Sequence, residues 1–356
     1  MAESTTVVRI IEVDGLSNEP AQQRLFAAWN EVYTSASRHL FGNEHSGFTV
    51  EEMVGRRRGS NHQFVDRAAV DGEPVGEIDP AAVVGMMSVA EPLKDNTDTG
   101  LLRLAVLPEH RRSGVGTELL RVGERVIAEH GRSVVQAITE WTEGNADESG
   151  EGFAAAYGYA PAQTTIRSAM PIRRGEHDLD HLRQLMAGDG VEDAAAFEIE
   201  ASVDDLPEAW LGDLAVLEQR MSTDAPQGDT TLEEESWDAA RVREELRWAL
   251  DSGRQVITAV ARDRLSDRLM GFTQIQVPPT DPTLAYQQDT LVLREARGNG
   301  LGLRLKACAA LELIKTSDEV TRIRTWNADD NTHMLAVNAD LGYEREGYLR
   351  VWEKQL

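Results

Sequence analysis

The sequence predicts a mixed α/β protein made of two tandem domains, and three observations support that prediction. An Arg-x-x-Gly-x-Gly segment occurs at 111–116 and again 186 residues later, at 297–302. Gly85 and Gly271 lie in similar apolar runs at the same spacing. Aliphatic, strand-like runs alternate with amphipathic, helix-like segments in both halves. In a chain of 356 residues, a repeat of this length indicates an internal duplication.

Residues 1–175 are expected to form the first domain. Its predicted strands lie at 7–13, 62–70, 82–90, 101–107, 134–139 and 163–172, and its predicted helices at 20–33, 116–130 and 153–157. The second of these helices carries Leu119, Leu120 and Ile127 on one face, as expected of a helix that packs on a sheet. A polar loop is expected at 37–46.

Residues 176–195 are expected to be an acidic linker, and residues 196–356 the second domain. Residues 176–250 carry 21 acidic and 5 basic side chains, a run typical of a solvated face. The predicted strands of this domain lie at 197–203, 256–261, 269–277, 290–293, 323–326 and 348–354. Its predicted helices lie at 206–221, 232–252 and 331–341, with another from the second glycine segment through Lys315.

Composition limits the possible functions. The net charge of −25 opposes binding to nucleic acid, because contact with backbone phosphates requires basic patches, whereas a cationic small amine would be attracted. A single cysteine, Cys308, excludes an intramolecular disulfide and a cysteine-based zinc site. The eight histidines show no spacing typical of metal ligands, so we expect no metal.

The start of the chain is polar, and no run of 18 apolar residues occurs anywhere. We therefore expect a soluble, cytoplasmic protein with no membrane partner. The sequence does not distinguish a monomer from a homodimer.

The glycine segments have the properties of an anion site. The first amides of a helix lack intrahelical acceptors, and the helix dipole adds positive potential there. Gly298, Gly300 and Gly302 would let the backbone approach a phosphate closely, and Arg297 would add a charged donor. An ordinary strand-to-helix turn would explain one copy, but the second copy favours a binding function.

These residues resemble a known family. An Arg-x-x-Gly-x-Gly turn between a strand and a helix, followed by a further strand and a closing Leu-Gly-Tyr at 341–343, is similar to motifs A and B of the GNAT N-acetyltransferase superfamily. The resemblance covers both halves and is closest to the two-domain class that includes mycothiol synthase. It implies a mixed, mostly antiparallel, twisted sheet flanked by helices in each domain. It also implies acetyl-CoA as co-substrate and transfer to a primary amine of a small molecule.

The resemblance assigns coenzyme A contacts to the glycine turn and to backbone groups of the strand before it. In the first half these residues are Leu104, Ala105, Val106, Arg111, Arg112, Ser113, Gly114, Val115, Gly116 and Thr117. In the second half they are Leu291, Val292, Leu293, Arg297, Gly298, Asn299, Gly300, Leu301 and Gly302. Asn331 and Asn338 would hold the pantetheine arm, although Asn331 could instead cap a helix.

Amine acetylation requires a base, because a protonated amine cannot attack a thioester. Asp289 is the candidate base, since it directly precedes the predicted strand; a turn carboxylate that caps the loop is the alternative. The family's usual acid, a tyrosine, is replaced by Asn338 in the second half and by Ala154 in the first. Tyr343 and Tyr348 are candidate substitutes, with a core tyrosine as the alternative for each.

Motifs A and B both occur intact only after residue 285, which favours catalysis in the second domain. The intact first glycine segment leaves open a protein with two active domains. The alternative function is non-catalytic binding or sensing of an acyl-CoA. In the first domain the resemblance places His39 and His45 near an acceptor, although solvated loop histidines are also possible. The identity of the acceptor cannot be inferred from the sequence.

Overall fold

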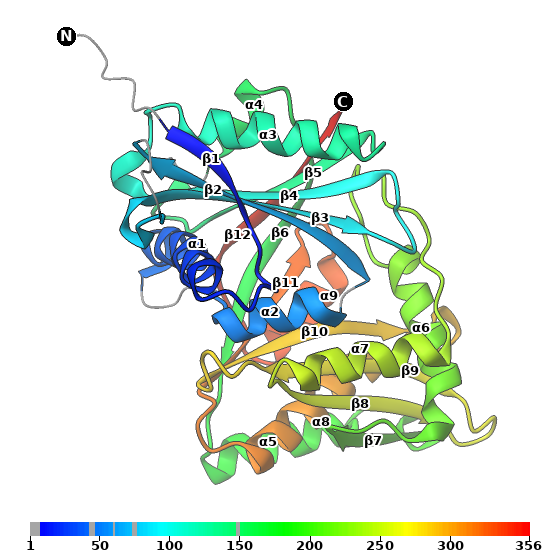
Figure 1. Ribbon diagram of the computed structural model, residues 1–356. Helices are drawn as coiled ribbons and strands as arrows, with labels where there is room; N and C mark the ends of the chain where they lie inside the picture. The colour runs from blue at the N-terminus through cyan, green and yellow to red at the C-terminus, as the bar shows by residue number, and fades with distance from the viewer. Residues whose placement is uncertain (1–7, 43–46, 60, 73–76, 147–149) are drawn as a thin grey trace. The chain divides into compact units, whose positions relative to one another are not determined.

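The computed structural model describes residues 8–42, 47–59, 61–72, 77–146 and 150–356. The chain folds into two compact units. Unit 1 comprises Met1–Gln163 and Leu349–Leu356, and unit 2 comprises Thr164–Tyr348. Each unit has a mixed, mostly antiparallel sheet with helices against it, which confirms the expected fold class (Figure 1). No helix in the described part of the chain is long and apolar enough to cross a membrane.

The sheet of unit 1 has the order β1-β2-β3-β4-β5-β12. Its strands are β1 (Val8–Val13), β2 (His62–Asp71), β3 (Val83–Pro92), β4 (Thr99–Val106), β5 (Val134–Trp141) and β12 (Glu344–Gln355). Neighbours from β1 to β4 pair antiparallel, and β4 pairs parallel with β5.

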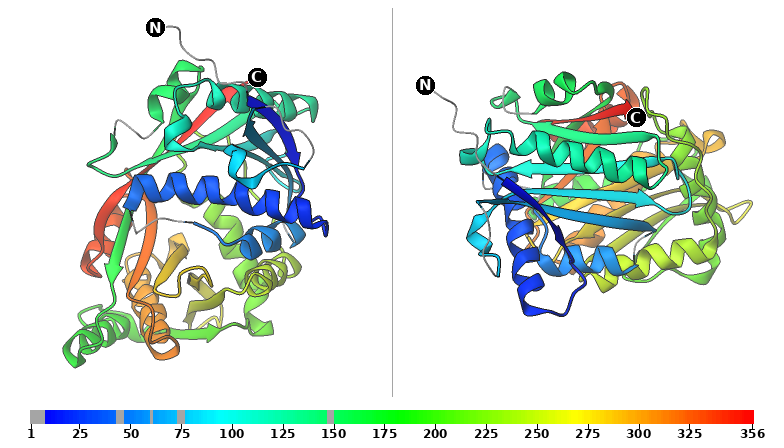
Figure 2. Two further views of the ribbon diagram at one scale, coloured as in Figure 1. Left: turned by 60° about the vertical axis from the view of Figure 1, so that its left-hand side comes forward. Right: turned by 45° about the horizontal axis from the view of Figure 1, so that its top comes forward.

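Helices cover both faces of this sheet (Figures 1 and 2). They are α1 (Pro20–Phe41), α2 (Val50–Gly59), α3 (Val115–Glu129) and α4 (Glu151–Ala156). Successive strand residues face opposite ways, so Met86 packs under α1 while Met87 packs under α3. Trp29 anchors the α1 side and is fully buried, with its indole N–H bonded to the Arg67 carbonyl at 3.0 Å.

The sheet of unit 2 has the order β6-β11-β10-β9-β8-β7. Its strands are β6 (Ala160–Pro171), β7 (Phe197–Val203), β8 (Gln255–Asp263), β9 (Leu269–Val277), β10 (Leu284–Val292) and β11 (Arg322–Ala328). Within the described part of this sheet, β10 and β11 pair parallel, whereas β6 with β11, β9 with β10, β8 with β9 and β7 with β8 pair antiparallel.

Two layers of helices pack on this second sheet. The helices are α5 (Glu176–Ala187), α6 (Leu211–Asp224), α7 (Ala239–Asp251), α8 (Leu301–Thr316) and α9 (Thr332–Asp340). Val260 packs with α6 and α7, whereas its neighbour Ala259 faces the cluster that contains α8. Unit 2 therefore repeats the two-core arrangement of unit 1, as a duplicated sequence requires.

The closing strand of each sequence half belongs largely to the unit formed by the other half. Residues Thr165–Pro171 of β6 pair with β11, and Met170 joins the core of unit 2. The C-terminal residues of β12 belong to unit 1, where the Trp352 indole donates to the Thr139 hydroxyl at 2.9 Å. The boundaries expected at 175 and 196 therefore differ from those of the structure, because a strand's partners are set by long-range pairing that its own pattern does not specify.

The segment expected to be a linker is an integral part of unit 2. It contains α5, whose Leu182 is buried, and Leu179 and Leu185 pack beside it, an apolar spacing of one helix face. The chain after α5 is fixed by Arg304, which donates to the carbonyls of Met186 and Ala194, each at 3.0 Å. The acidic residues of this stretch therefore do not prevent its apolar residues from packing in the core of unit 2.

Two further helix predictions need correction, and one helix was missed. Helix α1 continues to Phe41 through part of the expected polar loop, and α7 starts at Ala239, where the Asp238 carboxylate accepts from the Arg241 amide at 2.8 Å. Helix α2 was not predicted. Its start carries a capping box, in which Thr49 and Glu52 each bond the other's backbone N–H at 3.0–3.1 Å.

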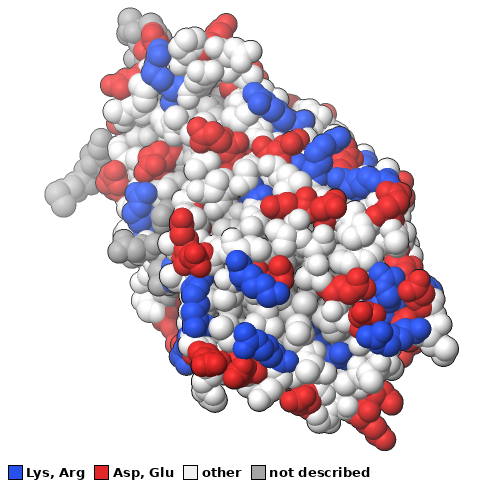
Figure 3. All heavy atoms as spheres, turned by 90° about the horizontal axis from the view of Figure 1, so that it is seen from below, with Lys and Arg blue, Asp and Glu red and all other residues white. Residues whose placement is uncertain are grey.

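Charged side chains of both signs are interspersed on the face shown in Figure 3. The net charge of −25 therefore does not produce a field of a single sign across that face.

Candidate functional site

In both units the two parallel strands separate before they end. Pairing joins Thr99–Leu102 to Val134–Ala137, although β4 continues to Val106 and β5 to Trp141. In unit 2, pairing joins Leu284–Tyr286 to Arg322–Arg324, although β10 continues to Val292. The separation leaves backbone groups of both strands available to a ligand that lies between them.

The first glycine turn follows β4 directly and leads into α3. Gly114 is the N-cap residue, with φ of 92°, a left-handed conformation that favours glycine. The Arg111 guanidinium donates to the Val106 carbonyl at 3.2 Å, which fixes the arginine against the end of β4. The side chain of Val115 is buried, so only its backbone amide is oriented towards an anion.

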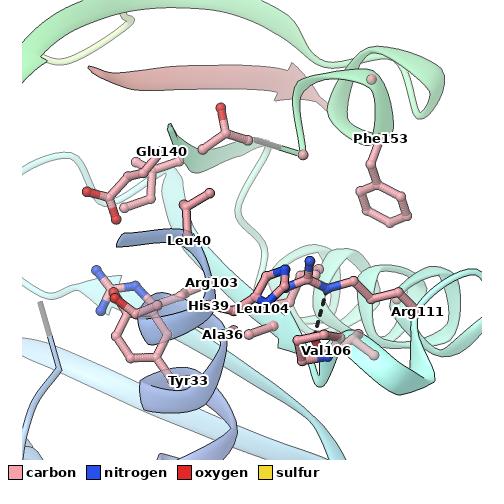
Figure 4. A pocket seen from close by; sticks show the side chains of 18 of the residues that line it. Tyr33, Ala36, His39, Leu40, Arg103, Leu104, Val106, Arg111, Glu140 and Phe153 are labelled. Carbon is pink, nitrogen blue, oxygen red and sulfur yellow. Dashed lines mark hydrogen bonds between the residues drawn. The ribbon is translucent and has the colours of Figure 1, made fainter. Parts of the chain in front are cut away.

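A cavity of about 1000 Å³ opens beside this turn (Figure 4). The predicted residues that line it are Leu104, Ala105, Val106, Arg111, Arg112, Gly114, Gly116 and Thr117. His39 lines it as well, whereas His45 lies outside the described residues. In Figure 4, Arg111 and Phe153 lie on one side of the cavity, and Arg103 and Tyr33 on the other.

The second glycine turn has the same local geometry, and its arginine is paired with a carboxylate. Gly300 caps α8 with φ of 64°, and Arg297 donates to the Val292 carbonyl at 3.0 Å, matching Arg111 and Val106. Arg297 also donates to the Asp224 carboxylate at 2.8 Å, and so does Arg294. The Arg294 hydrogen bond, together with the charges of Arg294 and Arg297, holds the pKa of Asp224 below its ordinary value.

Strand β10 contains a β-bulge immediately before the second turn. Gln287 pairs with Ile275 and Thr290 with Thr273, so the bulge inserts one extra residue at 288–289. The equivalent pairing in unit 1 runs without a shift from Leu101 to Val106. Asp289 therefore lies inside β10 at the bulge, not before the strand as the sequence suggested, and it is exposed.

Asp289 belongs to an acidic cluster formed by Glu218, Glu235, Glu245 and Asp289. Desolvation by the surrounding protein, together with the Glu235 charge, raises the pKa of Asp289. Burial and repulsion from Asp289 raise the pKa of Glu218 well above its ordinary value. Raised pKa values of this kind suit carboxylates that exchange protons near neutral pH.

Glu218, which α6 places in this cluster, was not predicted from the sequence. The available signal was the repeat itself, because the buried residues Trp29 and Val32 of α1 correspond to Leu214 and Leu217 of α6 at a spacing of 185. That spacing makes Glu218 the counterpart of Tyr33.

In unit 1 the corresponding positions hold a different pair. Arg103 precedes Val106 by three residues, as Asp289 precedes Val292. The Arg103 guanidinium lies 5.2 Å from the centroid of the Tyr33 ring, a cation–π contact. Unit 1 therefore has a cation at the position where unit 2 has a carboxylate.

The asparagines predicted to hold pantetheine have partners inside unit 2. Asn338 is buried, accepts from Lys306 Nζ at 2.8 Å, and donates to Asn327 at 2.6 Å. Burial lowers the pKa of Lys306 to about 7. Asn331 accepts from the Met334 amide at 3.1 Å and so caps α9, the alternative noted above.

Tyr343 packs against the core of unit 2, with Lys306 Nζ 5.5 Å from its ring centroid, and burial raises the pKa of its hydroxyl. Its assignment as an acid stays a prediction. Tyr157, which the sequence analysis did not single out, lines the cavity of unit 1, and its hydroxyl lies 2.6 Å from that of Thr117.

The remaining predicted residues support the second turn through packing and backbone contacts. The side chains of Leu291, Leu293 and Leu301 are buried, and Asn299 donates to the Ala296 carbonyl at 3.0 Å. Within the described residues, no group of three or more His, Cys, Asp or Glu side chains could hold a metal ion.

The first glycine turn lies in a segment that matches a known family. Residues 24–148 match the family model described as "Acetyltransferase (GNAT) family". The chain is 28% identical over 275 residues to a mycothiol acetyltransferase from Arthrobacter sp. (strain FB24), which covers 76% of this chain and 75% of that protein. A mycothiol acetyltransferase from Pseudarthrobacter chlorophenolicus is 26% identical over the same length.

Solved structures share the fold over the whole chain. A tandem GNAT protein from the clavulanic acid biosynthesis pathway has a TM-score of 0.74 at 22% identity and covers 98% of both chains. A GCN5-related N-acetyltransferase from Sphaerobacter thermophilus has a TM-score of 0.61 at 16% identity, with 97% of this chain and 95% of that chain covered. Residues 24–148 of unit 1 thus match the GNAT acetyltransferase family, and the chain as a whole shares its fold with a tandem GNAT protein.

Proposed function

We propose that this protein is an acetyl-CoA-dependent N-acetyltransferase that acetylates a primary amine, with transfer in unit 2. The observation that carries the proposal is the acidic cluster beside the β10 bulge, at the edge of the separated strands β10 and β11. A carboxylate there can attract an ammonium group and remove the proton that prevents its attack on a thioester.

The second glycine turn would hold the pyrophosphate through backbone amides at the start of α8. The pantetheine arm would lie between β10 and β11, and a backbone amide released by the bulge at 288–289 would polarise the thioester carbonyl. Asp289, with Glu218 beside it, would accept the amine proton directly or through water. Unit 1 offers a cation, Arg103, at that position, which disfavours amine activation there.

Single substitutions in the two turns would test this assignment. A Cβ on Gly302 meets nothing within 4 Å, and one on Gly116 comes no closer than 3.6 Å to Phe153, so neither position resists a side chain. Gly302→Glu and Gly116→Glu therefore place a carboxylate where pyrophosphate would bind, without the left-handed strain that Gly300 or Gly114 would suffer.

Release of free coenzyme A thiol from acetyl-CoA would be measured with a panel of primary amines. We expect Gly302→Glu to abolish release and Gly116→Glu to retain it. Loss in Gly116→Glu alone would assign transfer to unit 1. If the wild-type protein released no thiol with any amine, yet bound acetyl-CoA, the alternative function of acyl-CoA binding or sensing would replace the proposal.

A further inference from the structure

The cavity of unit 1 contains a cation that the proposed chemistry does not use. Arg103 lines the cavity of about 1000 Å³ and also a smaller one of about 200 Å³. Among the described residues, its guanidinium has the Tyr33 ring as partner and no hydrogen-bonded or ion-paired carboxylate. A half-buried guanidinium retains donors for a planar anion under these conditions.

Arg103 is separated from the arginines that would meet coenzyme A phosphates. Arg111 and Arg112 belong to the glycine turn, and in Figure 4 Arg111 lies across the cavity from Arg103. Arg103 itself projects from β4 at the point where pairing with β5 has just ended, after Leu102. A thioester that lies between the separated strands would bring its acyl group to this end of the cavity.

Fixed geometry makes Arg103 suitable for recognition. Its stem is held by β4, and the Tyr33 ring orients its guanidinium at 5.2 Å. Arginine binds carboxylates through two parallel hydrogen bonds, and such charge-assisted bonds gain strength where water is partly excluded. Glu140 lies on the same side in Figure 4 and would favour a neighbouring ammonium or N–H group over a second anion.

From these contacts we infer that the unit 1 cavity binds a ligand whose carboxylate is held by Arg103, next to a coenzyme A thioester or thiol. The carboxylate has two chemical sources. It terminates the acyl group of a dicarboxylic thioester, or it belongs to an acceptor such as an α-amino acid. This inference rests on coenzyme A as the ligand of the turns but not on the unit in which acetyl transfer occurs.

Calorimetric titrations of the full chain would test it, all in the Gly302→Glu background to silence unit 2. The probes are acetyl-CoA, succinyl-CoA, and glycine or glutamate added to protein saturated with coenzyme A. Each is titrated into the parent, Arg103→Gln, Arg103→Lys and the control Arg125→Gln, an exposed arginine of α3 that does not line the cavity.

If the acyl group supplies the carboxylate, succinyl-CoA binds about tenfold or more tightly than acetyl-CoA, as expected for a charged hydrogen bond. If the acceptor supplies it, the two thioesters bind alike and the amino acid binds to the coenzyme A complex. In either case Arg103→Gln removes the effect, which is the preference for succinyl-CoA in the first case and binding of the amino acid in the second. Arg103→Lys retains part of that effect, and Arg125→Gln does not change it.

Equal affinities for every probe in the parent and in Arg103→Gln would overturn the inference while leaving the proposed function intact. Failure of both thioesters to bind the Gly302→Glu protein would overturn it too, because unit 1 would then hold no thioester. The proposed function fails by a different result, which is retention of turnover in Gly302→Glu.

Discussion

The Arg297 guanidinium lies 2.8 Å from the Asp224 carboxylate, so the arginine of the second glycine turn is already paired within the fold. Arg297 also donates to the carbonyl of Val292 at the end of its strand, at 3.0 Å. Its counterpart Arg111 donates in the same way to the Val106 carbonyl, at 3.2 Å. The two turns therefore share backbone geometry, and the charge of Arg297 is already paired with Asp224. Phosphate binding by the second turn would depend mainly on helix amides.

Removal of the competing carboxylate should strengthen coenzyme A binding in unit 2. We expect Asp224→Asn to tighten acetyl-CoA binding by several-fold in the Gly116→Glu background, since Arg297 and Arg294 would then be free to meet phosphate. The gain should shrink with added salt, because exposed charges are screened. Calorimetry at low and high salt measures both effects.

Asp318→Asn, an exposed substitution at the far end of α8, is the matched control and should change neither value. Weaker binding in Asp224→Asn would mean that Asp224 positions Arg297 for the ligand, the opposite of competition.

Loss of the candidate base should reduce turnover without changing donor affinity. We expect Asp289→Asn to lower kcat by about 10²- to 10⁴-fold, the usual contribution of a general base, with the Kd for acetyl-CoA unchanged. Because desolvation raises the pKa of Asp289, wild-type kcat/KM should rise with pH through a midpoint above the ordinary carboxyl range. Stopped assays of thiol release between pH 4 and pH 9 would measure the midpoint.

Glu235→Gln is expected to lower that midpoint, since it removes the neighbouring negative charge that raises the pKa of Asp289. An Asp289→Asn variant with wild-type kcat would exclude Asp289 as the base and direct attention to Glu218.

The buried Lys306 makes stability depend on pH. Its pKa falls from 10.5 to about 7 in the folded protein, so between these values the unfolded chain binds more protons and stability rises with pH. Relative to Lys306→Met, the wild-type free energy of unfolding should increase by up to about 1.4 kcal/mol per pH unit from pH 7 upward. Urea unfolding at pH 6, 7.5 and 9 measures this slope.

The slope is the informative quantity, because Lys306→Met also removes the hydrogen bond to Asn338. Lys315→Met, at an exposed position, should leave the slope unchanged. Parallel curves for wild type and Lys306→Met would mean that Lys306 keeps its charge in the folded state.

Strand β12 should link the C-terminus to the stability of unit 1. Trp352 is buried and bonded to Thr139, so we expect Trp352→Ala to destabilise unit 1 by about 3–5 kcal/mol. In the Gly302→Glu background, the unfolding transition that acetyl-CoA stabilises should then occur at a lower temperature. Thermal unfolding with and without acetyl-CoA would measure this shift. Unchanged melting would mean that β12 is dispensable for unit 1.

The repeat and the local patterns predicted two mixed α/β domains and the two glycine turns, and the resemblance to the GNAT motifs implied the type of sheet. Strand and helix patterns are local, and glycines such as Gly114 and Gly300 mark positions where a turn needs a left-handed backbone. The bounds of many of these elements were therefore predicted to within a few residues. Asp289 was also identified as a candidate from its place beside the second turn. The bulge that contains it depends on pairing with β9, which no local pattern specifies.

Tertiary structure decided which side chains meet. Glu218 joins Asp289, Asp224 pairs with Arg297, and Arg103 reaches Tyr33, each across at least 60 residues of chain. It also decided that the closing strand of each sequence half belongs largely to the unit formed by the other half. The physical reason is the same in each case: packing, strand pairing and electrostatic interaction depend on distances in space, whereas the sequence by itself records only the order of residues and their local preferences.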